Sequence, residues 1–282
     1  NPGIDFTGGA AINVKYTEAI SSNQIVEALS GVMQDDAVVQ ATADNSFFIR
    51  VGILELDQRD DSGQVVRRGE ESEVRQALKS IGPGEIVSFD SVSGVIGDEN
   101  VRNAIIAVIV ASIVILVYVT WAFRRVPTPF RYGVAAIVAL IHDVFIVLGV
   151  FSVLGETINL QVNAMFITGV LTTIGYSVND TIVVFDRLRE NVARYPGAAI
   201  SELVNISVRE TIGRSLNTSI TLIVVVVALL LFAGASIQPL LYVLLAGVAV
   251  GTYSSIFIAS LTLVAWEQGE IGRAFRLLTF RR

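Results

Sequence analysis

Hydrophobic positions form long, nearly uninterrupted runs in the second part of this chain, whereas the first 98 residues alternate apolar and polar positions over short distances. A helix needs roughly 20 apolar residues to cross the hydrocarbon core of a bilayer. We expect five membrane-spanning helices, at about 101–123, 132–154, 161–185, 215–233 and 239–266.

The shorter pattern of residues 1–98 predicts a small α+β domain. Ser21 or Ser22 can cap its first helix, and the run Gly82-Pro83-Gly84 stops its second. The segment 57–69 is charged and is expected to be a loop. The order β-α-β-β-α-β favours a ferredoxin-like fold. The expected elements are a strand at 4–14, a helix to about residue 32, strands at 37–43 and 47–54, a helix at 70–81 and a strand at 85–95.

Composition agrees with this division into two parts. Of the 282 residues, 52% are hydrophobic and only 16% are charged, too few charges for a soluble domain of this length. Residues 1–98 hold 16 acidic and 7 basic side chains, while the remainder has a net charge of +3. We therefore expect an acidic domain at 1–98, a membrane bundle at 99–270 and a basic tail at 271–282. The chain has no cysteine, so thiols do not indicate a redox compartment.

The connections between the spans divide by charge, which predicts a direction in the membrane. The connections 155–160 and 234–238 contain no Lys or Arg. The positive-inside rule places the basic connections and the C-terminus in the cytoplasm, with Trp121 and Trp266 as anchors at the cytoplasmic ends of their spans. Five spans then place residues 1–98 outside the cytoplasm, and we expect a further span before Asn1. The basic residues of the connections and the C-terminus are Arg124, Arg125, Arg131, Arg187, Arg189, Arg194, Arg209, Arg214, Arg273, Arg276, Arg281 and Arg282.

Three ionisable residues lie well inside predicted spans: His142, Asp143 and Asp180. A charge at the centre of a spanning helix costs ~2.5–3.5 kcal/mol on insertion scales, so each is a functional hypothesis. Asp180 lies on a stripe of polar and small residues that should face another helix or water rather than lipid. The other members of that stripe are Gly169, Thr172, Thr173, Tyr176 and Ser177.

The following span begins at Arg214, with Asn217, Thr218 and Thr221 on the same helical face. A guanidinium near a carboxylate inside the membrane is the smallest set of groups that can form a proton relay. A static tie of Asp180 to Arg214 or to an Asn that holds the bundle together is the alternative. Asp143, beside His142, is a second candidate for the relay, and a buried polar pair is an equal alternative there.

The last span carries Gly247, Gly251 and Ser255 at intervals of four residues. This pattern favours close helix packing, although small residues are common in membrane helices in any case. Residues 1–98 show no phosphate-binding loop, no cluster of metal ligands and no nucleophile–base pair. We therefore expect a domain without catalytic activity, and neither a metal nor a resident cofactor.

Three stretches of the chain resemble the SecF family. They are Gly3-Ile4-Asp5-Phe6-Thr7-Gly8-Gly9, the eighteen residues 174–191 that include Tyr176, Ser177, Asn179 and Asp180, and Arg214-Ser215-Leu216-Asn217-Thr218-Ser219. The resemblance implies an RND-like bundle whose soluble domain lies outside a prokaryotic inner membrane. It also implies that Asp180 lies in a proton pathway, with Arg214 as its basic partner. Asp5, Phe6, Thr7, Gly8 and Gly9 are then structural.

The same resemblance implies the partners. SecD would form a heterodimer with this chain and supply a facing Asp, the SecYEG channel and YajC would associate with the pair, and an unfolded preprotein would be the substrate. Protons are the coupling ion, membrane lipid surrounds the bundle, and no nucleic acid is involved. The family uses the proton-motive force to draw preproteins outward and release them.

Three other classes of protein compete with this interpretation. An intramembrane aspartyl protease would need Asp143 and Asp180 to share a proton, but the Gly-x-Gly-Asp pattern is absent before Asp180. An RND-type exporter of small molecules or lipids would use the same proton chemistry. An inert scaffold would need no titratable Asp180.

Overall fold

The computed structural model describes residues 2–32, 37–41, 45–55, 58–59, 65–67, 69–158, 160–232, 234 and 237–270. The tail predicted at 271–282 lies outside the described residues. The chain divides into two compact units. The first combines Asn1–Ala104 with Gln161–Ala164, and the second combines Ile105–Leu160 with Met165–Arg282.

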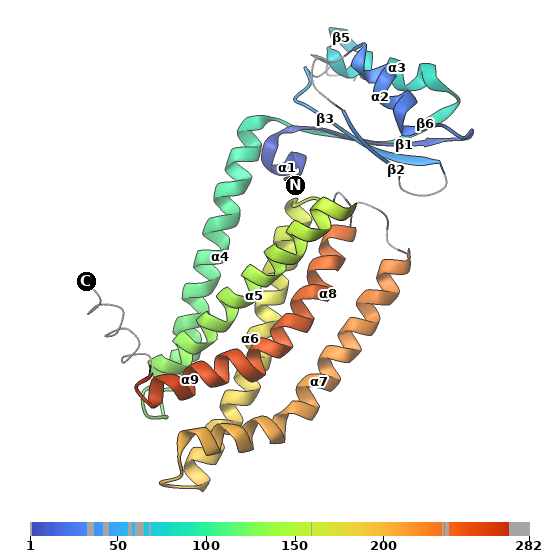
Figure 1. Ribbon diagram of the computed structural model, residues 1–282. Helices are drawn as coiled ribbons and strands as arrows, with labels where there is room; N and C mark the ends of the chain where they lie inside the picture. The colour runs from blue at the N-terminus through green and yellow to red at the C-terminus, as the bar shows by residue number, and fades with distance from the viewer. Residues whose placement is uncertain are drawn as a thin grey trace, which may run out of the picture. The chain divides into compact units, whose positions relative to one another are not determined.

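The first unit is built on a four-stranded antiparallel sheet in the order β2-β3-β1-β6. Helices α2 (Ser22–Ser30) and α3 (Glu70–Ile81) cover one face of it (Figure 1). Alternate residues of β1, such as Ile12 and Val14, are buried against the helices, as the two-residue period of a half-covered strand requires. The strands are β1 (Gly9–Tyr16), β2 (Val38–Ala41), β3 (Ser46–Val51) and β6 (Gly84–Val92).

These elements follow the predicted β-α-β-β-α-β order, with two additions: a short helix, α1 (Ile4–Thr7), before β1, and a pair of short strands. A short pair of strands, β4 (Gln58–Arg59) and β5 (Val65–Arg67), lies within the segment predicted as a charged loop. Ser21 caps α2 through a reciprocal capping box with Gln24, the arrangement that satisfies two exposed N–H groups at once.

The N-terminal strand predicted at 4–14 is wrong in its first part. Residues Ile4–Thr7 form a short helix, α1, which is closed by a hydrogen bond from the Gly8 N–H to the Ile4 carbonyl at 2.9 Å. Gly8 has a φ of +73°, and this left-handed conformation ends the helix and turns the chain into β1. At the other end of the unit, β6 ends at Val92 and α4 begins at Gly94, so the last residues of the strand predicted at 85–95 belong to the helix. The last residues of the strand predicted at 37–43 lie outside the described residues.

Long helices make up most of the second unit and overlap the predicted spans, although α4 and α7 begin 7 and 15 residues before the predicted starts. The last one continues from α8 through a π-helical segment into α9. The helices are α4 (Gly94–Ala122), α5 (Pro129–Ile158), α6 (Ala164–Arg194), α7 (Ile200–Phe232), α8 (Gln238–Tyr253), the π-helix Ser254–Ala259 and α9 (Ser260–Glu267).

Four of the helices in the described part of the chain are long and apolar enough to cross a membrane: α4, α5, α7 and the continuous helix Gln238–Glu267. Helix α6 is also long, but the polar residues of its sequence signature lower its mean hydropathy. Its crossing of the membrane stays a prediction.

Helix α6 packs closely against α8 at three glycines. A Cβ atom added at Gly247 would lie 2.4 Å from Thr173, and one added at Gly251 would lie 2.9 Å from Ser177. Gly169 of α6 meets Val243 in the same way, at 2.8 Å. The small residues recognised in the last span therefore have a partner, because only glycine permits these helices to approach so closely.

Candidate functional site

Asp180 is buried in the helical unit, with 4% of its surface exposed. Its Oδ2 atom has no hydrogen-bond partner. A buried carboxylate oxygen normally has partners, because desolvation without compensation is costly. Asp180 is therefore an unsatisfied polar group of the kind that marks a functional site or a missing partner.

Arg214, the predicted basic partner, is exposed on α7. No ion pair or hydrogen bond joins the Arg214 and Asp180 side chains in the described part of the chain. Thr218, one turn further on, is exposed as well and donates a hydrogen bond to the Arg214 carbonyl at 2.9 Å.

Asp143, in contrast, is buried and well satisfied. Its Oδ2 accepts hydrogen bonds from the hydroxyls of Ser177 at 2.6 Å and Ser254 at 2.7 Å. His142 Nδ1 lies 3.1 Å from its Oδ1. These contacts join α5, α6 and the last helix at one carboxylate. Ser177, which the periodicity placed on the Asp180 face, is hydrogen-bonded to Asp143.

The π-helical segment Ser254–Ala259 adjoins this carboxylate. Ser255 donates to the Ser177 carbonyl at 2.9 Å and receives a hydrogen bond from Thr181 at 3.0 Å. Short π-helical segments occur frequently at functional sites. Ser254 and Thr181 are not among the site residues that the sequence predicts. The run Tyr253-Ser254-Ser255 in an apolar helix was the available signal.

A second polar network lies on the α7 side of α6. The Tyr176 hydroxyl lies 2.9 Å from Ser219 Oγ, and Ser219 is hydrogen-bonded in turn to Thr252. Ser215, one turn before Ser219, is buried and its hydroxyl has no hydrogen-bond partner. The sequence pattern places Tyr176 on the same helical face as Asp180, whereas it gives no role to Ser219 or Thr252.

A second set of polar and small residues on α6, different from the stripe that contains Asp180, is exposed in this chain and is called the exposed stripe. It consists of Thr168, Thr172, Gly175 and Asn179, at spacings of four, three and four residues, which place them on one face. Asn217 of α7, also a predicted site residue, is exposed too. Such residues at membrane depth face protein or water rather than hydrocarbon.

The turn between α6 and α7 is tied by hydrogen bonds outside the predicted spans. Glu210 accepts from Arg187 at 2.7 Å and from Asn191 at 2.9 Å, and these bonds lower the pKa of Glu210 to about 2. Leu203 and Val204 are buried. The polar contacts and the apolar face together hold the start of α7 in place.

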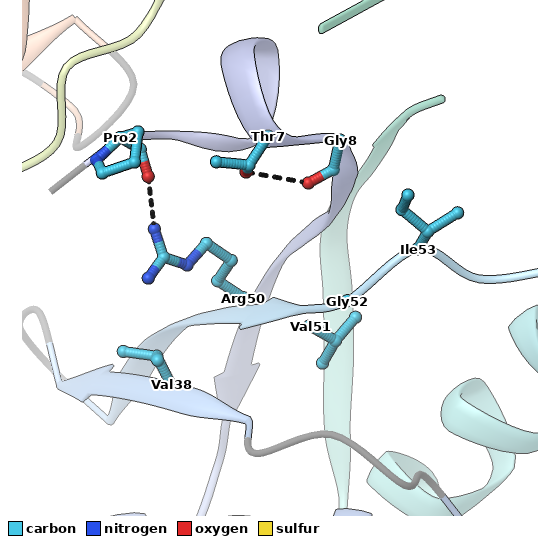
Figure 2. Close-up of a pocket in the computed structure, with 8 residues that line it drawn as sticks. All are labelled: Pro2, Thr7, Gly8, Val38, Arg50, Val51, Gly52 and Ile53. Carbon is cyan, nitrogen blue, oxygen red and sulfur yellow. Dashed lines mark hydrogen bonds between the residues drawn. The ribbon is translucent and has the colours of Figure 1, made fainter. Parts of the chain in front are cut away.

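In the first unit, the Asp5–Gly9 motif occupies the junction of several elements. Gly8 and Gly9 are buried, Asp5 and Phe6 are half-buried, and Thr7 is exposed. An open pocket of about 400 Å³ lies beside it, lined in part by Thr7 and Gly8 (Figure 2).

Arg50 lines the same pocket and donates a hydrogen bond to the Pro2 carbonyl at 2.7 Å, as Figure 2 shows. Burial lowers the pKa of the Arg50 guanidinium from its ordinary value. In neither unit do the described residues include three His, Asp or Glu side chains grouped to hold a metal ion.

Long apolar helices, carboxylates buried among them and an α+β unit define a multi-pass membrane protein. Residues 73–269 match the family described as protein export membrane protein SecD/SecF, C-terminal. The chain belongs to this family.

Similar proteins carry names that agree with the family. The chain is 40% identical to the protein translocase subunit SecF of Thermobaculum terrenum, over 97% of this chain and 87% of that protein. It is 37% identical to SecF of Anaerolinea thermophila, over 95% of this chain and 84% of that protein. With the subunit SecDF of Bacillus subtilis it shares 34% identity, over 96% of this chain and 35% of that longer protein.

Solved structures agree as well. The crystal structure of SecDF from Thermus thermophilus, a translocon-associated membrane protein, matches with a TM-score of 0.79 and 34% identity, over 95% of this chain and 34% of that one. The chain thus spans about a third of the solved SecDF. The family and the named relatives give the present chain a role in Sec protein export. Export of small molecules is not favoured, and the names of the relatives indicate no hydrolytic activity.

Proposed function

We propose that this chain is a SecF-type subunit that uses the proton-motive force, together with SecD, to promote preprotein translocation and release. The observation that carries this proposal is the buried Asp180 with an unpaired carboxylate oxygen. A carboxylate in such a place can bind and release a proton, and each event changes its charge. Protons are the coupling ion, and no resident cofactor is required.

In this mechanism, proton binding changes the interaction of Asp180 with Arg214 and the packing of α6. Asp143 stays fixed in this mechanism, because its hydrogen bonds from Ser177 and Ser254 already hold α5, α6 and the π-helical segment together. It is also the secondary candidate for carrying the proton. One charge moving through the membrane potential supplies ~2.3 kcal/mol per 100 mV, so a few protons per cycle suffice to bias a two-state bundle.

The exposed stripe on α6 is the proposed contact with SecD. Relatives named SecDF, in which the two names are joined, support this partner. A facing Asp from SecD would complete the site around Asp180. The SecYEG channel, YajC and an unfolded preprotein are the further partners implied by the resemblance to SecF.

The first unit is, in this proposal, a ferredoxin-like domain outside the cytoplasm of a prokaryotic cell, with the helical unit in the inner membrane. The strand order β2-β3-β1-β6 with two helices on one face supports the fold. The distribution of arginine among the connections supports the direction.

The test is preprotein export by cells carrying Asp180→Asn, with Asp180→Glu and Asp186→Asn as matched variants of the same helix. A titratable carboxylate at 180 predicts at least a tenfold loss of export with Asn, partial retention with Glu, and near-normal export with Asp186→Asn at equal protein levels. Normal export by Asp180→Asn would contradict the proposal and favour the scaffold alternative.

A further inference from the structure

The carboxylate of Asp5 caps the helix that carries Asp180. Its Oδ2 accepts a hydrogen bond from the Ala164 N–H at 2.8 Å, and α6 begins at Ala164. The first N–H groups of a helix have no partner within the helix, and a negative charge there also interacts favourably with the helix dipole. Asp5 supplies this cap from a position 159 residues away in the sequence.

The chain around Asp5 is paired with the segment that leads into α6. The Gly3 N–H donates to the Val162 carbonyl at 2.7 Å, and Pro2 and Val162 form a parallel bridge. Residues 161–164 accordingly belong to the same compact unit as the sheet. Three consecutive contacts therefore fasten the start of α6 to the first residues of the chain.

The other side of α1 is fastened to the sheet and to α4. Asn100 donates to the Asp5 carbonyl at 2.9 Å, and a Cβ at Gly97 would lie 2.9 Å from the Phe6 carbonyl oxygen. On the sheet side, Arg50 of β3 donates to the Pro2 carbonyl (Figure 2). Gly9 opens β1. Residues 2–8 thus contact the starts of α6 and α4 and strand β3, and lead directly into β1.

We propose that Asp5 is a positioning residue that couples α6 to the sheet during the transport cycle. This inference rests on the proposed function, in which Asp180 is the proton site of α6. A shift of α6 passes through the Asp5–Ala164 hydrogen bond to α1 and then directly into β1. Without the cap, Asp180 still binds and releases protons, but the movement of α6 no longer reaches the domain.

The test separates proton movement from export, using the assembled complex with SecD. Asp5→Ala is expected to lower preprotein export at least tenfold while Asp180-dependent proton entry into vesicles stays within twofold of normal. Asp5→Asn retains export, because an amide oxygen still accepts the Ala164 N–H. The exposed Asp98→Ala in α4 is the matched control and retains both activities.

A cysteine bridge provides the second arm. The chain has no cysteine, and a Cβ on Gly3 would lie 3.1 Å from the Asn163 Cβ, close to the ~3.5–4.5 Å spacing of disulfides. Oxidised Gly3→Cys/Asn163→Cys in the Asp5→Ala background is expected to restore export, and a reductant is expected to abolish it again. Export is compared before and after reduction of the same assembled, bridged protein. Poor accumulation of the unbridged Asp5→Ala variant therefore does not obscure the result.

Normal export by Asp5→Ala, loss of proton entry in parallel with export, or no rescue by the bridge would overturn the inference. These outcomes differ from a failure of the proposed function, which would appear as normal export or proton entry in Asp180→Asn.

Discussion

At the scale of single residues, two adjacent glycines decide the geometry of the N-terminal motif. Gly9 has a φ of +122°, and a Cβ there would lie 2.5 Å from the Val51 carbonyl oxygen. Gly8 has a φ of +73°, and a Cβ there would lie 2.9 Å from the Gly94 backbone. Both positions need a residue without a side chain, for conformational and steric reasons together.

We therefore predict that Gly9→Ala destabilises the protein by at least about 1–3 kcal/mol, the range for backbone strain of this kind. The measurement is the Tm of the purified protein in detergent. Gly31→Ala is the matched control, because Gly31 has a φ of −76° and its Cβ would meet only the Ala28 carbonyl oxygen at 3.8 Å. An equal Tm for the two variants would show that Gly9 is not strained by a side chain.

The two buried aspartates also differ at this scale. Asp143 has its Oδ2 satisfied twice, whereas the Oδ2 of Asp180 has no partner. Two buried aspartates thus differ in hydrogen bonding, because hydroxyl donors surround the Oδ2 of Asp143 and none reaches the Oδ2 of Asp180. The first suits a fixed tie and the second a group that changes its charge.

At the scale of elements, α6 presents a different chemistry on each side. Gly169 and Thr173 meet α8, Tyr176 reaches Ser219 of α7, and Ser177 reaches Asp143 of α5. The remaining side holds the exposed stripe of Thr168, Thr172, Gly175 and Asn179. No Cβ contact would arise within 4 Å of Gly175, so the stripe is open in this chain.

We predict that Gly175→Leu lowers the amount of SecD that co-purifies with this chain at least fivefold, since a large side chain would keep a partner helix from approaching. Gly149→Leu on α5 is the matched control, because its Cβ also meets nothing within 4 Å. Equal recovery of SecD with both variants would remove the stripe as the contact surface.

At the scale of the whole molecule, arginine and tryptophan gather at the ends of helices in the second unit. The Arg124 guanidinium lies 4.5 Å from the Trp121 ring centroid, and Arg131 lies 6.0 Å from that of Trp266. Glu267 accepts from Arg131 at 2.7 Å, which joins the start of α5 to the end of α9. Aromatic and basic side chains in these positions are typical of a membrane interface.

The proposed direction in the membrane predicts a labelling pattern. In the cysteine-free chain, Ala19→Cys in the first unit should react with an impermeant maleimide in right-side-out vesicles. Ala193→Cys at the end of α6 should react only after permeabilisation. Both positions are exposed, so accessibility to the reagent does not differ for other reasons. The reverse pattern would contradict the direction derived from the arginine distribution.

The sequence by itself determined the approximate position of the long helices, the order of the main strands and helices, a serine cap for α2 at Ser21 or Ser22, and the family. These follow from local quantities such as run length, period and charge, which act between residues close in the chain. The tertiary structure alone decided which side chains meet. Ser254 reaches Asp143 across 111 positions, and Asp5 reaches Ala164 across 159. A helical period assigns a residue to a face, but its partner depends on how all the helices pack, and the π-helical segment shifts that face by an amount the pattern does not reveal.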